Sequence, residues 1–440
     1  MIEAPLHGFT GTDSPSAAIY DQCVRCGLCL PTCPTYLETM TETSGPRGRI
    51  SLIKSVAEGH LDLLSPGFVH QMSECLDCRA CEAVCPSGVR YGQLIETARA
   101  QIDRAQSPTR SPSIRLLRWF GLRVLFSRPA TMRAFAALLR FYQRSGLRSL
   151  VRASGALRLL GLAEAERFAP TISDRPFAAR GQSFPVANAK CTVFFHVGCV
   201  MHVAFAQVNE ASVRVLGRAG CSVVIPAAQG CCGAIGVHAG DIEFGRELAK
   251  RNIAAFEASG ADFYVVNAAG CGSALKEYGT LFAEDARWAS RAAAFSTRVR
   301  DILELLDAVG IDPRLGRIDR TITYQEPCHL AHAQRITAAP RRLLARIPGL
   351  QLIEMAESSV CCGSAGIYNV TEPEMAGRLR HRKIANATAT NAEICATANP
   401  GCALQMETGL REAGSEMAIK HVVELIDESY AAYSAAATRS

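Results

Sequence analysis

The sequence lacks several features that mark common classes of protein. No stretch of about 18 or more apolar residues is free of charge, so we expect no transmembrane helix. Residues 1–20 lack the basic and then apolar segments of a secretion signal, so we expect a reducing, cytoplasmic location. No motif for binding nucleic acid is present, and the net charge of +6 is modest for 440 residues, so we expect no nucleic-acid partner.

Two further scarcities concern the chemistry of the chain. No glycine-rich G-x-G-x-x-G fingerprint follows a predicted strand, so the chain is not expected to bind a flavin or to oxidise an organic substrate alone. Aromatic residues make up only 7% of the sequence, whereas cysteine is abundant, with 19 residues. In a reducing compartment, so many cysteines indicate metal ligation rather than disulfides.

Two runs of cysteines near the N-terminus share one spacing. Both follow C-x-x-C-x-x-C-x-x-x-C-P, the pattern of bacterial two-cluster ferredoxins. Structural zinc sites use paired C-x-x-C units, so two 4Fe–4S clusters are the favoured interpretation. In this pattern the cysteine before the proline serves the other cluster. The predicted ligands are Cys23, Cys26, Cys29 and Cys85 for the first cluster, and Cys75, Cys78, Cys81 and Cys33 for the second.

Residues 1–103 are expected to form a helical module around these cysteines. The motif Gly45-Pro46-Arg47-Gly48 predicts a turn, and the apolar residues from Ile50 to Ala57 predict a short helix after it. A second helix is predicted from about Tyr91 to Ala105. The cysteine runs would then lie in loops between helices.

Residues 104–189 are predicted to be an Arg-rich helical linker or docking segment. Residues 104–163 contain twelve arginines and several aromatic residues but no Asp, Glu or Lys. Basic amphipathic helices with aromatic anchors can lie on an anionic membrane, and Arg and aromatic residues are also enriched at protein interfaces. A solvated linker, in which Arg stems cover apolar surface, is the alternative. We favour docking, and the sequence leaves partner and membrane open.

From residue 190 the pattern alternates between strands and helices. Strands are predicted at residues 192–195, 222–226 and 262–267, and helices at residues 203–219 and 241–259. Such alternation is typical of an α/β fold with a mainly parallel sheet.

This α/β half repeats itself at a nearly constant spacing. Cys199 corresponds to Cys328, Cys231-Cys232-Gly233 to Cys361-Cys362-Gly363, and Cys271 to Cys402. The repeat predicts two pseudo-symmetric domains, at residues 190–315 and 316–440. Ligand crevices form at the carboxyl ends of parallel strands, and these cysteines follow predicted strands. The candidate ligands are Cys199, Cys231, Cys232 and Cys271 in the first repeat, and Cys328, Cys361, Cys362 and Cys402 in the second.

Other cysteines and histidines are weaker candidates. Four histidines near these loops could replace a ligand, although a hydrogen-bonding or packing role is favoured for each. They are His202, His238, His329 and His332. Cys191, Cys221 and Cys395 have no counterpart in the other repeat and are predicted to pack as small apolar groups.

The Cys-Cys-Gly blocks resemble the CCG-domain proteins, which include a component of heterodisulfide reductase. From about residue 20 to residue 427, the chain resembles the iron–sulfur subunits of glycolate oxidase, which combine a two-cluster ferredoxin-like domain with two CCG domains. The motifs that carry the resemblance lie at residues 33–36, 45–50, 85–91, 230–234, 270–279 and 361–366.

The resemblance implies an electron-transfer role. FAD on partner subunits would oxidise glycolate to glyoxylate, and this chain would pass the electrons to a respiratory acceptor, quinone. It implies FAD-binding glycolate oxidase subunits as partners, and contact with quinone or with the inner face of the cell membrane. The same role in a glycerol-3-phosphate or D-lactate dehydrogenase complex is an alternative.

One departure from the family pattern limits what can be transferred. The full CCG pattern ends in C-x-x-C, but Ala274 and Gln405 occupy the last position here. Each repeat keeps four cysteines, which suffice for a further 4Fe–4S cluster or a zinc ion. They do not support the non-cubane cluster of heterodisulfide reductase, and they disfavour its thiol chemistry. A scaffold whose repeats bind zinc or no metal stays open.

Overall fold

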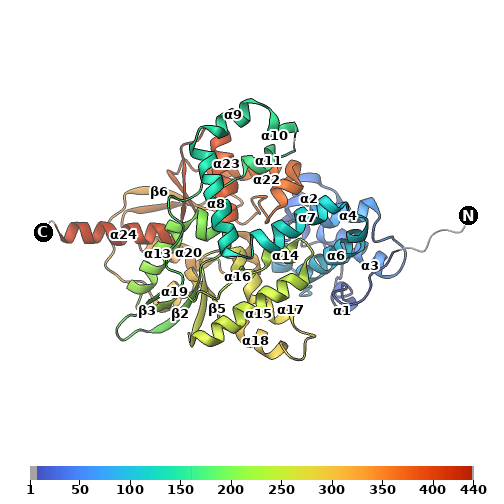
Figure 1. The fold of residues 1–440 in the computed structure, drawn as a ribbon, viewed down its shortest axis with the longest axis horizontal. Coiled ribbons are helices and arrows are strands. Elements are labelled where there is room, and N and C mark those ends of the chain that lie inside the picture. Colours follow the sequence, from blue (N-terminus) through green and yellow to red (C-terminus); the bar gives the residue numbers. More distant parts are fainter. Residues whose placement is uncertain (1–6, 160, 439–440) are drawn as a thin grey trace, which may run out of the picture.

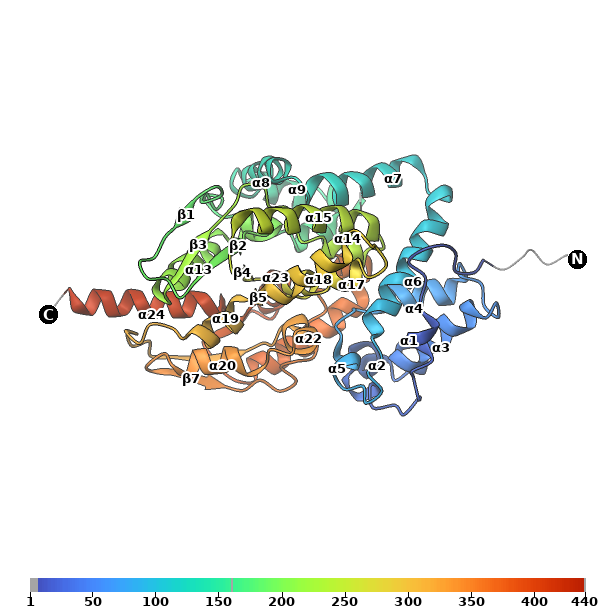
Figure 2. The same ribbon diagram turned by 90° about the horizontal axis from the view of Figure 1, so that it is seen from below.

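The computed structural model describes residues 7–159 and 161–438. A helical N-terminal module lies beside two α/β units, and a helical segment on one side connects the module to the first of these units (Figure 1, Figure 2). Within the described residues, no helix is both long and apolar enough to cross a membrane.

The N-terminal module is built from short helices around one apolar core. Its centre contains the fully buried side chains of Ile53, Met72, Leu94 and Ile95. The helices are α1 (Ala17–Tyr20), α2 (Pro34–Thr39), α3 (Pro46–Ala57), α4 (Pro66–Glu74), α5 (Ala80–Ala83) and α6 (Tyr91–Gln106), with 3-10 turns η1 (Leu30–Thr32), η2 (Glu42–Ser44) and η3 (Ser107–Thr109).

The start of α3 corrects one prediction. The motif Gly45-Pro46-Arg47-Gly48 is not a separate turn, because Gly45 caps α3 and Pro46 is its first residue. Proline suits this position, since its fixed φ is helical and the N–H that it lacks would have no partner in the first turn. Gly48 is inside the helix, where a Cβ would collide with the carbonyl group of Glu42.

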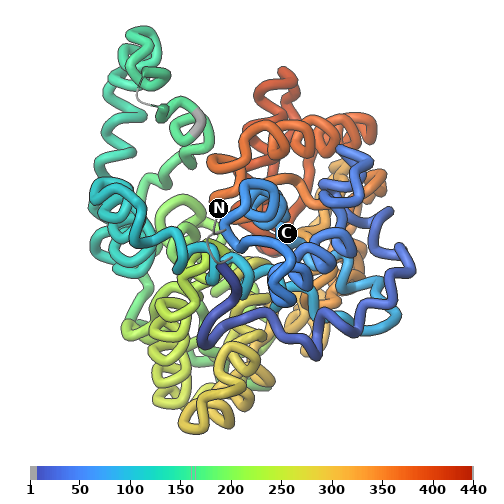
Figure 3. Tube along the Cα trace, turned by 90° about the vertical axis from the view of Figure 1, so that its right-hand side faces the viewer, coloured from blue at the N-terminus to red at the C-terminus, as the bar shows by residue number. Residues whose placement is uncertain are grey.

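The helices of the Arg-rich segment end at Arg167, so residues 168–189 are not helical as the sequence predicts and instead contribute a short strand at Ser183–Phe184. The helical part forms an arm on one side of the molecule, which projects beyond the rest of the chain in Figure 3. Its helices are α7 (Pro112–Trp119), the π-helical turn η4 (Phe120–Leu125), α8 (Pro129–Arg144), α9 (Leu147–Ala153), α10 (Ala156–Leu159) and α11 (Ala163–Arg167).

The first α/β unit has a five-stranded sheet in the order β1-β3-β2-β4-β5, parallel except for β1. Its strands are β1 (Ser183–Phe184), β2 (Cys191–His196), β3 (Cys221–Val224), β4 (Phe263–Val266) and β5 (Val299–Asp301). Its helices are α12 (Cys199–Ala204), α13 (Ala206–Arg218), α14 (Ala234–His238), α15 (Ile242–Ser259), α16 (Ala269–Lys276), α17 (Tyr278–Leu281), α18 (Ala289–Arg298) and α19 (Ile302–Val309). The helix predicted at residues 203–219 is confirmed as α13, but it begins three residues later than expected, because Phe205 leaves the helical conformation and separates α12 from α13.

The second α/β unit has a fully parallel four-stranded sheet in the order β7-β6-β8-β9. Its strands are β6 (Arg320–Tyr324), β7 (Leu350–Ile353), β8 (Ile394–Thr397) and β9 (Ala418–His421). Its helices are the π-helical turn η5 (His329–Ala333), α20 (Ala338–Ala345), α21 (Tyr368–Thr371), α22 (Pro373–Thr388), α23 (Pro400–Glu412) and α24 (Val422–Ala437). The predicted α/β architecture with mainly parallel sheets is confirmed.

The two α/β units share a hydrophobic core. Val193 and Val265 from the first sheet belong to the same buried cluster as Ile322 and Ile394 from the second. Helices α13 and α24 pack against each other, as do α19 and α20, so that both repeats contribute to the layer between the sheets. This common core fixes the position of the carboxyl ends of one sheet relative to those of the other.

Candidate functional site

The two cysteine loops of the N-terminal module share one backbone feature. Arg25 and Gly27 flank Cys26 with φ angles of 56° and 86°, and Asp77 and Arg79 flank Cys78 with φ angles of 50° and 63°. Left-handed residues on both sides of a cysteine curl the loop tightly, and residues other than glycine adopt this conformation only uncommonly. Each loop can therefore turn three closely spaced thiols toward one point.

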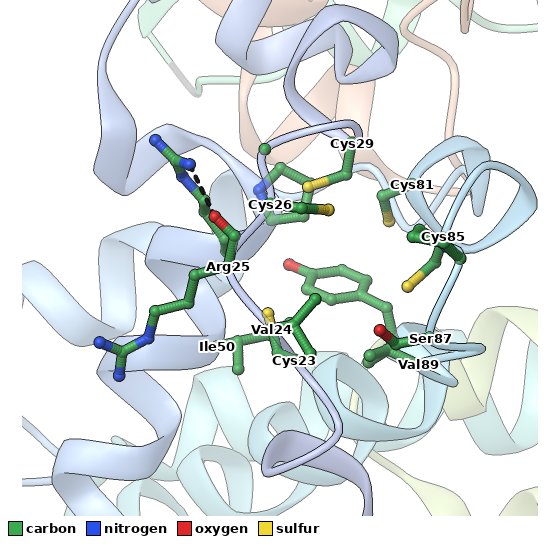
Figure 4. Close-up of a pocket in the computed structure, with 15 residues that line it drawn as sticks. Cys23, Val24, Arg25, Cys26, Cys29, Ile50, Cys81, Cys85, Ser87 and Val89 are labelled. Carbon is green, nitrogen blue, oxygen red and sulfur yellow. Dashed lines mark hydrogen bonds between the residues drawn. The ribbon is translucent and has the colours of Figure 1, made fainter.

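The first loop faces a cavity that contains the four cysteines predicted for the first cluster. Cys23, Cys26, Cys29 and Cys85 line it, and their sulfur atoms surround the space shown in Figure 4. The cavity has an empty volume of about 430 Å³, including its open mouth. Arg47 closes one side, because its guanidinium donates a hydrogen bond of 3.0 Å to the carbonyl oxygen of Arg25.

A second cavity of about 300 Å³ contains the four cysteines predicted for the second cluster. Cys33, Cys75, Cys78 and Cys81 line it. Cys81 also lines the first cavity, so the two spaces are neighbours. Neither set is joined by disulfides. Four thiols around a buried space fit a 4Fe–4S cluster, which is held by four thiolates.

Polar groups beside the second cavity are placed to stabilise negative charge on sulfur. The Asp77 N–H and the Tyr91 hydroxyl donate hydrogen bonds to the Cys75 Sγ, at 3.4 Å and 3.7 Å. Arg49, only 1% exposed, lines the cavity and is held by Glu74 at 2.9 Å. Burial raises the pKa of the Cys81 thiol well above its ordinary value. A bound cation would therefore have to displace the thiol proton.

In the first repeat, four cysteines gather at the carboxyl ends of the strands. Cys199 and Cys271 lie at the starts of α12 and α16, after β2 and β4, while Cys231 and Cys232 lie in the loop after β3. The Cys231 and Cys199 sulfur atoms are 3.9 Å apart, and those of Cys232 and Cys271 are 3.1 Å apart. A hydrogen bond from the Cys232 thiol, aided by the nearby His196 ring, lowers the pKa of Cys271 to about 6.

The second repeat gathers its cysteines in the same way. The sulfur atoms of Cys328 and Cys361 are 3.8 Å apart, and the neighbouring thiols of Cys361 and Cys402 lower the pKa of Cys362. Asn399 donates a hydrogen bond of 3.4 Å to the Cys402 Sγ through its Nδ2. Its Oδ1 accepts one of 3.1 Å from the Gly270 N–H in the first repeat, so one side chain connects the two cysteine sets.

Glycine makes each Cys-Cys loop possible. Gly233 and Gly363 have φ angles of 84° and 86°, in the left-handed region that other residues disfavour. A Cβ on Gly363 would also lie 2.8 Å from the carbonyl oxygen of Ala376. The turn after the second cysteine therefore requires glycine, and it allows adjacent side chains to join one set.

Two residues at corresponding positions hold these loops differently. Asn252 on α15 donates to the Cys231 carbonyl oxygen and accepts from the Gly230 N–H, both at 2.9 Å. Lys383 occupies the corresponding place on α22, where its Nζ donates to the carbonyl oxygens of Glu357 and Ser358. Lys383 is only 2% exposed, so the second cysteine set has a buried ammonium group nearby that the first set lacks. The one feature of the sequence that could have identified Lys383 is its position 131 residues after Asn252, which matches the spacing of the repeat.

The histidines named as alternative ligands mostly have other contacts. His238 Nδ1 lies 3.2 Å from Asp77 and 3.0 Å from Glu96, while His329 and His332 bond the carbonyl oxygens of Asp77 and Ser359. The ring nitrogens of His202 have no partner among the described residues. His196, which the sequence did not single out, is instead the histidine that lies close to Cys231 and Cys271, with its Nδ1 2.8 Å from the Tyr264 hydroxyl.

Asp77, Glu96 and His238 lie close enough together to suit a metal ion. Arg79 already supplies positive charge there, since its guanidinium lies 2.9 Å from Asp77 and 3.5 Å from Glu96. It also pairs with Glu277 of the first repeat at 3.2 Å. This buried charge cluster therefore joins the N-terminal module to the first repeat and is not a metal site.

The cysteines without a repeat partner lie on strands, outside the loops and helix starts that carry these sets. Cys191 and Cys221 are opposite each other on β2 and β3, with sulfur atoms 3.5 Å apart. Cys395 is fully buried on β8. All three are part of the packed sheets.

The second cavity of the module lies directly against the cysteines of the second repeat. Leu76, Cys78 and Ala80 share one apolar cluster with Cys361 and Tyr368. The Tyr368 hydroxyl donates a hydrogen bond of 2.8 Å to the Glu74 carbonyl oxygen across this interface. The two sets of thiols are thus neighbours in space, although they lie about 280 residues apart in the sequence.

Family models divide the chain into the same parts. A 4Fe-4S dicluster domain matches residues 19–89. The linker region of the glycolate oxidase iron-sulfur subunit matches residues 113–169. The cysteine-rich CCG domain matches residues 193–276 and 322–407. The predicted iron–sulfur class and the CCG repeats are confirmed, whereas the assignment of single ligands stays a prediction.

Individual relatives extend this similarity over most of the chain. The probable glycolate oxidase iron-sulfur subunit of Bacillus subtilis (strain 168) is 42% identical over 417 residues, covering 92% of this chain and 93% of the relative. The glycolate oxidase iron-sulfur subunit of Escherichia coli (strain K12) is 35% identical over 415 residues, 94% of each chain. Lactate utilization protein A of Oceanobacillus iheyensis is 29% identical over 237 residues, covering 53% of this chain and 96% of the relative. This chain belongs to the family of glycolate oxidase iron–sulfur subunits.

Proposed function

We propose that this chain is the electron-transfer subunit of a glycolate oxidase complex. It accepts electrons from FAD-carrying subunits that oxidise glycolate to glyoxylate, and it delivers them to a respiratory acceptor, quinone. The observation that carries the proposal is the series of four-cysteine sets within one chain, two of them lining adjoining cavities. The complex would work in the cytoplasm, peripherally on the inner face of the cell membrane.

The lining of the two cavities supports an assignment of the residues that would hold the cofactors. Cys23, Cys26, Cys29 and Cys85 would bind one 4Fe–4S cluster, and Cys33, Cys75, Cys78 and Cys81 the other. Such clusters, when bound, accept and donate single electrons. The four cysteines of each repeat would hold a further metal centre, because they gather at the carboxyl ends of the strands. Sulfur–sulfur distances of 3.9 Å and 3.8 Å match the edge of a tetrahedral site with metal–sulfur bonds of about 2.3 Å, and a 4Fe–4S cluster would require these sulfur atoms to move apart.

The surroundings of the two module sites differ in a way that suits a relay. Cys26 is exposed, as are Val24 and Leu28 beside it, so the first site can meet another protein. The cysteines of the second site are buried and lie against the second repeat. The chain therefore provides one site that is exposed at the surface and one that is buried beside the second repeat.

Iron and sulfide analysis combined with electron paramagnetic resonance would test the proposal. About eight irons per chain indicate module clusters alone, and about twelve or sixteen indicate clusters in one or both repeats. Glycolate should reduce the clusters only when the FAD-carrying subunits are present. Glycolate oxidation by this chain alone, or no reduction in the assembled complex, would contradict it.

The similarity to lactate utilization protein A over about half of the chain favours a second candidate. In that case the chain would have the same role with lactate as the substrate of the partner subunits. Comparing glycolate with D- and L-lactate as reductants of the clusters in the isolated complex separates the two.

A further inference from the structure

The arm formed by residues 112–162 has an unusual surface. More than half of the large exposed apolar side chains in the described part of the chain lie on it. They are Ile114, Leu116, Leu117, Trp119, Phe120, Phe135, Leu138, Phe141, Leu147, Leu150, Leu159 and Leu162. Isolated exposed apolar residues are normal, but a concentration of this kind marks an interaction site.

Helix α8 shows that this exposure is not a packing defect. Its buried face, with Met132 and Ala136, packs onto Ile172 and Val203 of the body. Its other face exposes Phe135, Leu138 and Phe141, which follow one another at three-residue intervals. Such spacing places them on one stripe of the helix. The helix thus has one apolar face that is covered and a second that is open.

The charges of the arm are divided in a similar way. Several of its arginines are neutralised by acids outside residues 112–162: Arg118 pairs with Asp103, Arg123 with Asp241, and Arg148 and Arg152 with Glu166. Four others are exposed and form no ion pair within the described residues. They are Arg115, Arg128, Arg133 and Arg158. Because the arm contains no Asp or Glu, its open surface is both apolar and positive.

These features indicate which kind of binding partner could cover the open surface of the arm. A second copy of the chain would bring identical guanidinium groups together, which is unfavourable. A membrane-surface helix presents one continuous apolar face, whereas the arm beyond α8 consists of the short helices α9 and α10, of 7 and 4 residues, and turns back on itself (Figure 3). Enrichment in aromatic residues and Arg with depletion of Lys, Asp and Glu is the composition of protein interfaces.

We propose that this arm docks onto another protein of the same oxidase complex, whose matching surface is an apolar groove bordered by carboxylates. The inference rests on the proposed function, since the docking partner would be a component of that complex. The exposed leucines and aromatic rings would fill the groove, and Arg133 and Arg158 would pair with its acidic border.

Assembly of the complete complex tests this inference. The triple variant L138S/F141S/L150S should bind the co-expressed glycolate-oxidising subunits at least about tenfold more weakly, because buried apolar anchors dominate interface affinity. The control I353S removes an exposed apolar residue on β7, outside the arm, and should assemble normally. The iron content of both variants should equal that of the natural chain, which checks folding.

A second variant and a vesicle assay complete the test. Reversing charge with R133E/R158E should also weaken assembly without removing apolar contacts, even if the triple variant folds poorly. Vesicles of phosphatidylethanolamine and phosphatidylglycerol should not capture the free chain. Normal assembly of both the triple variant and the charge-reversal variant would overturn the proposal. It would also be overturned if the free natural chain bound vesicles or dimerised and these two variants no longer did so. Reduction of the clusters by glycolate is measured separately in the natural complex, so failure of the relay function is distinguishable from failure of docking.

Discussion

At the scale of single residues, equivalent positions in the two repeats have diverged around a common set of cysteines. Asn252 and Lys383 each hold a Cys-Cys-Gly loop through backbone groups, but only Lys383 carries an ammonium group. A buried cation beside thiolates favours negative charge on them. The two repeats therefore present similar ligands in different electrostatic environments.

This difference predicts unequal reduction potentials in the two repeats. If each repeat holds a cluster, Lys383→Asn should lower the potential of the second site by roughly 60 mV, which corresponds to about 1.4 kcal/mol for one electron. The reciprocal variant Asn252→Lys should raise the potential of the first site. Redox titration followed by electron paramagnetic resonance measures both. Unchanged potentials with iron retained would show that the ammonium group only supports the loop.

At the scale of elements, the loop from Cys75 to Cys81 does two things at once. It lines the second cavity, and its Asp77 and Arg79 meet His238, Glu96 and Glu277 in a buried charge cluster. Burial lowers the pKa of His238, but hydrogen bonds with Asp77 and Glu96 outweigh this effect and raise it to about 10. The loop is thus fixed by charges to helices α6 and α14 and to Glu277, which lies between α16 and α17.

His238 should make the stability of the protein depend on pH. Because its pKa is raised by folding, its contribution to the free energy of unfolding is complete below about pH 6.5 and disappears as the pH rises to about 10. Between pH 7 and pH 10 the free energy of unfolding of the natural chain should therefore fall by up to about 1.4 kcal/mol per pH unit more than that of the His238→Gln variant. Anaerobic urea unfolding at several pH values measures this slope.

The exposed His60 provides the matched control for that experiment, since its side chain is 74% exposed. His60→Gln should keep the pH dependence of the natural chain. Equal slopes for the natural chain and His238→Gln would mean that the charge cluster does not stabilise the docked loop.

At the scale of the whole molecule, the two halves are stabilised by different means. The α/β units share an extensive apolar core drawn from both sheets. The N-terminal module has a smaller core, of which Cys75 and Cys81 are themselves part. Removal of bound clusters would leave the module with two cavities lined by unligated thiols.

Removal of iron should therefore loosen one half selectively. After anaerobic chelation, the segment before α7 should become sensitive to proteases, because small metal-binding domains depend on their metal for stability. The α/β units should remain resistant and keep their sheet signal in circular dichroism. Cleavage within both halves at equal rates would show that the shared core also depends on the clusters.

Much of this architecture was predictable because it rests on local patterns. The strands at residues 192–195, 222–226 and 262–267 were placed within two residues of their observed bounds, since buried parallel strands are short β-branched or aromatic runs. The helix from Tyr91 was also found. The break at Phe205 and the role of Pro46 as a first helical residue were missed, because both depend on what surrounds them.

The sequence by itself determined the chemistry of the chain: thiol ligands in repeated sets, with spacings that tight loops require. Those features are local, since they depend on neighbouring residues and on glycine or left-handed backbone. Tertiary structure alone decided which cysteine sets are neighbours and that Cys78 packs beside the second repeat. It also placed Lys383, His196 and Asn399 close to the cysteines. It also decided that the arm leaves an apolar face open. These outcomes depend on contacts between distant segments, which no local pattern records.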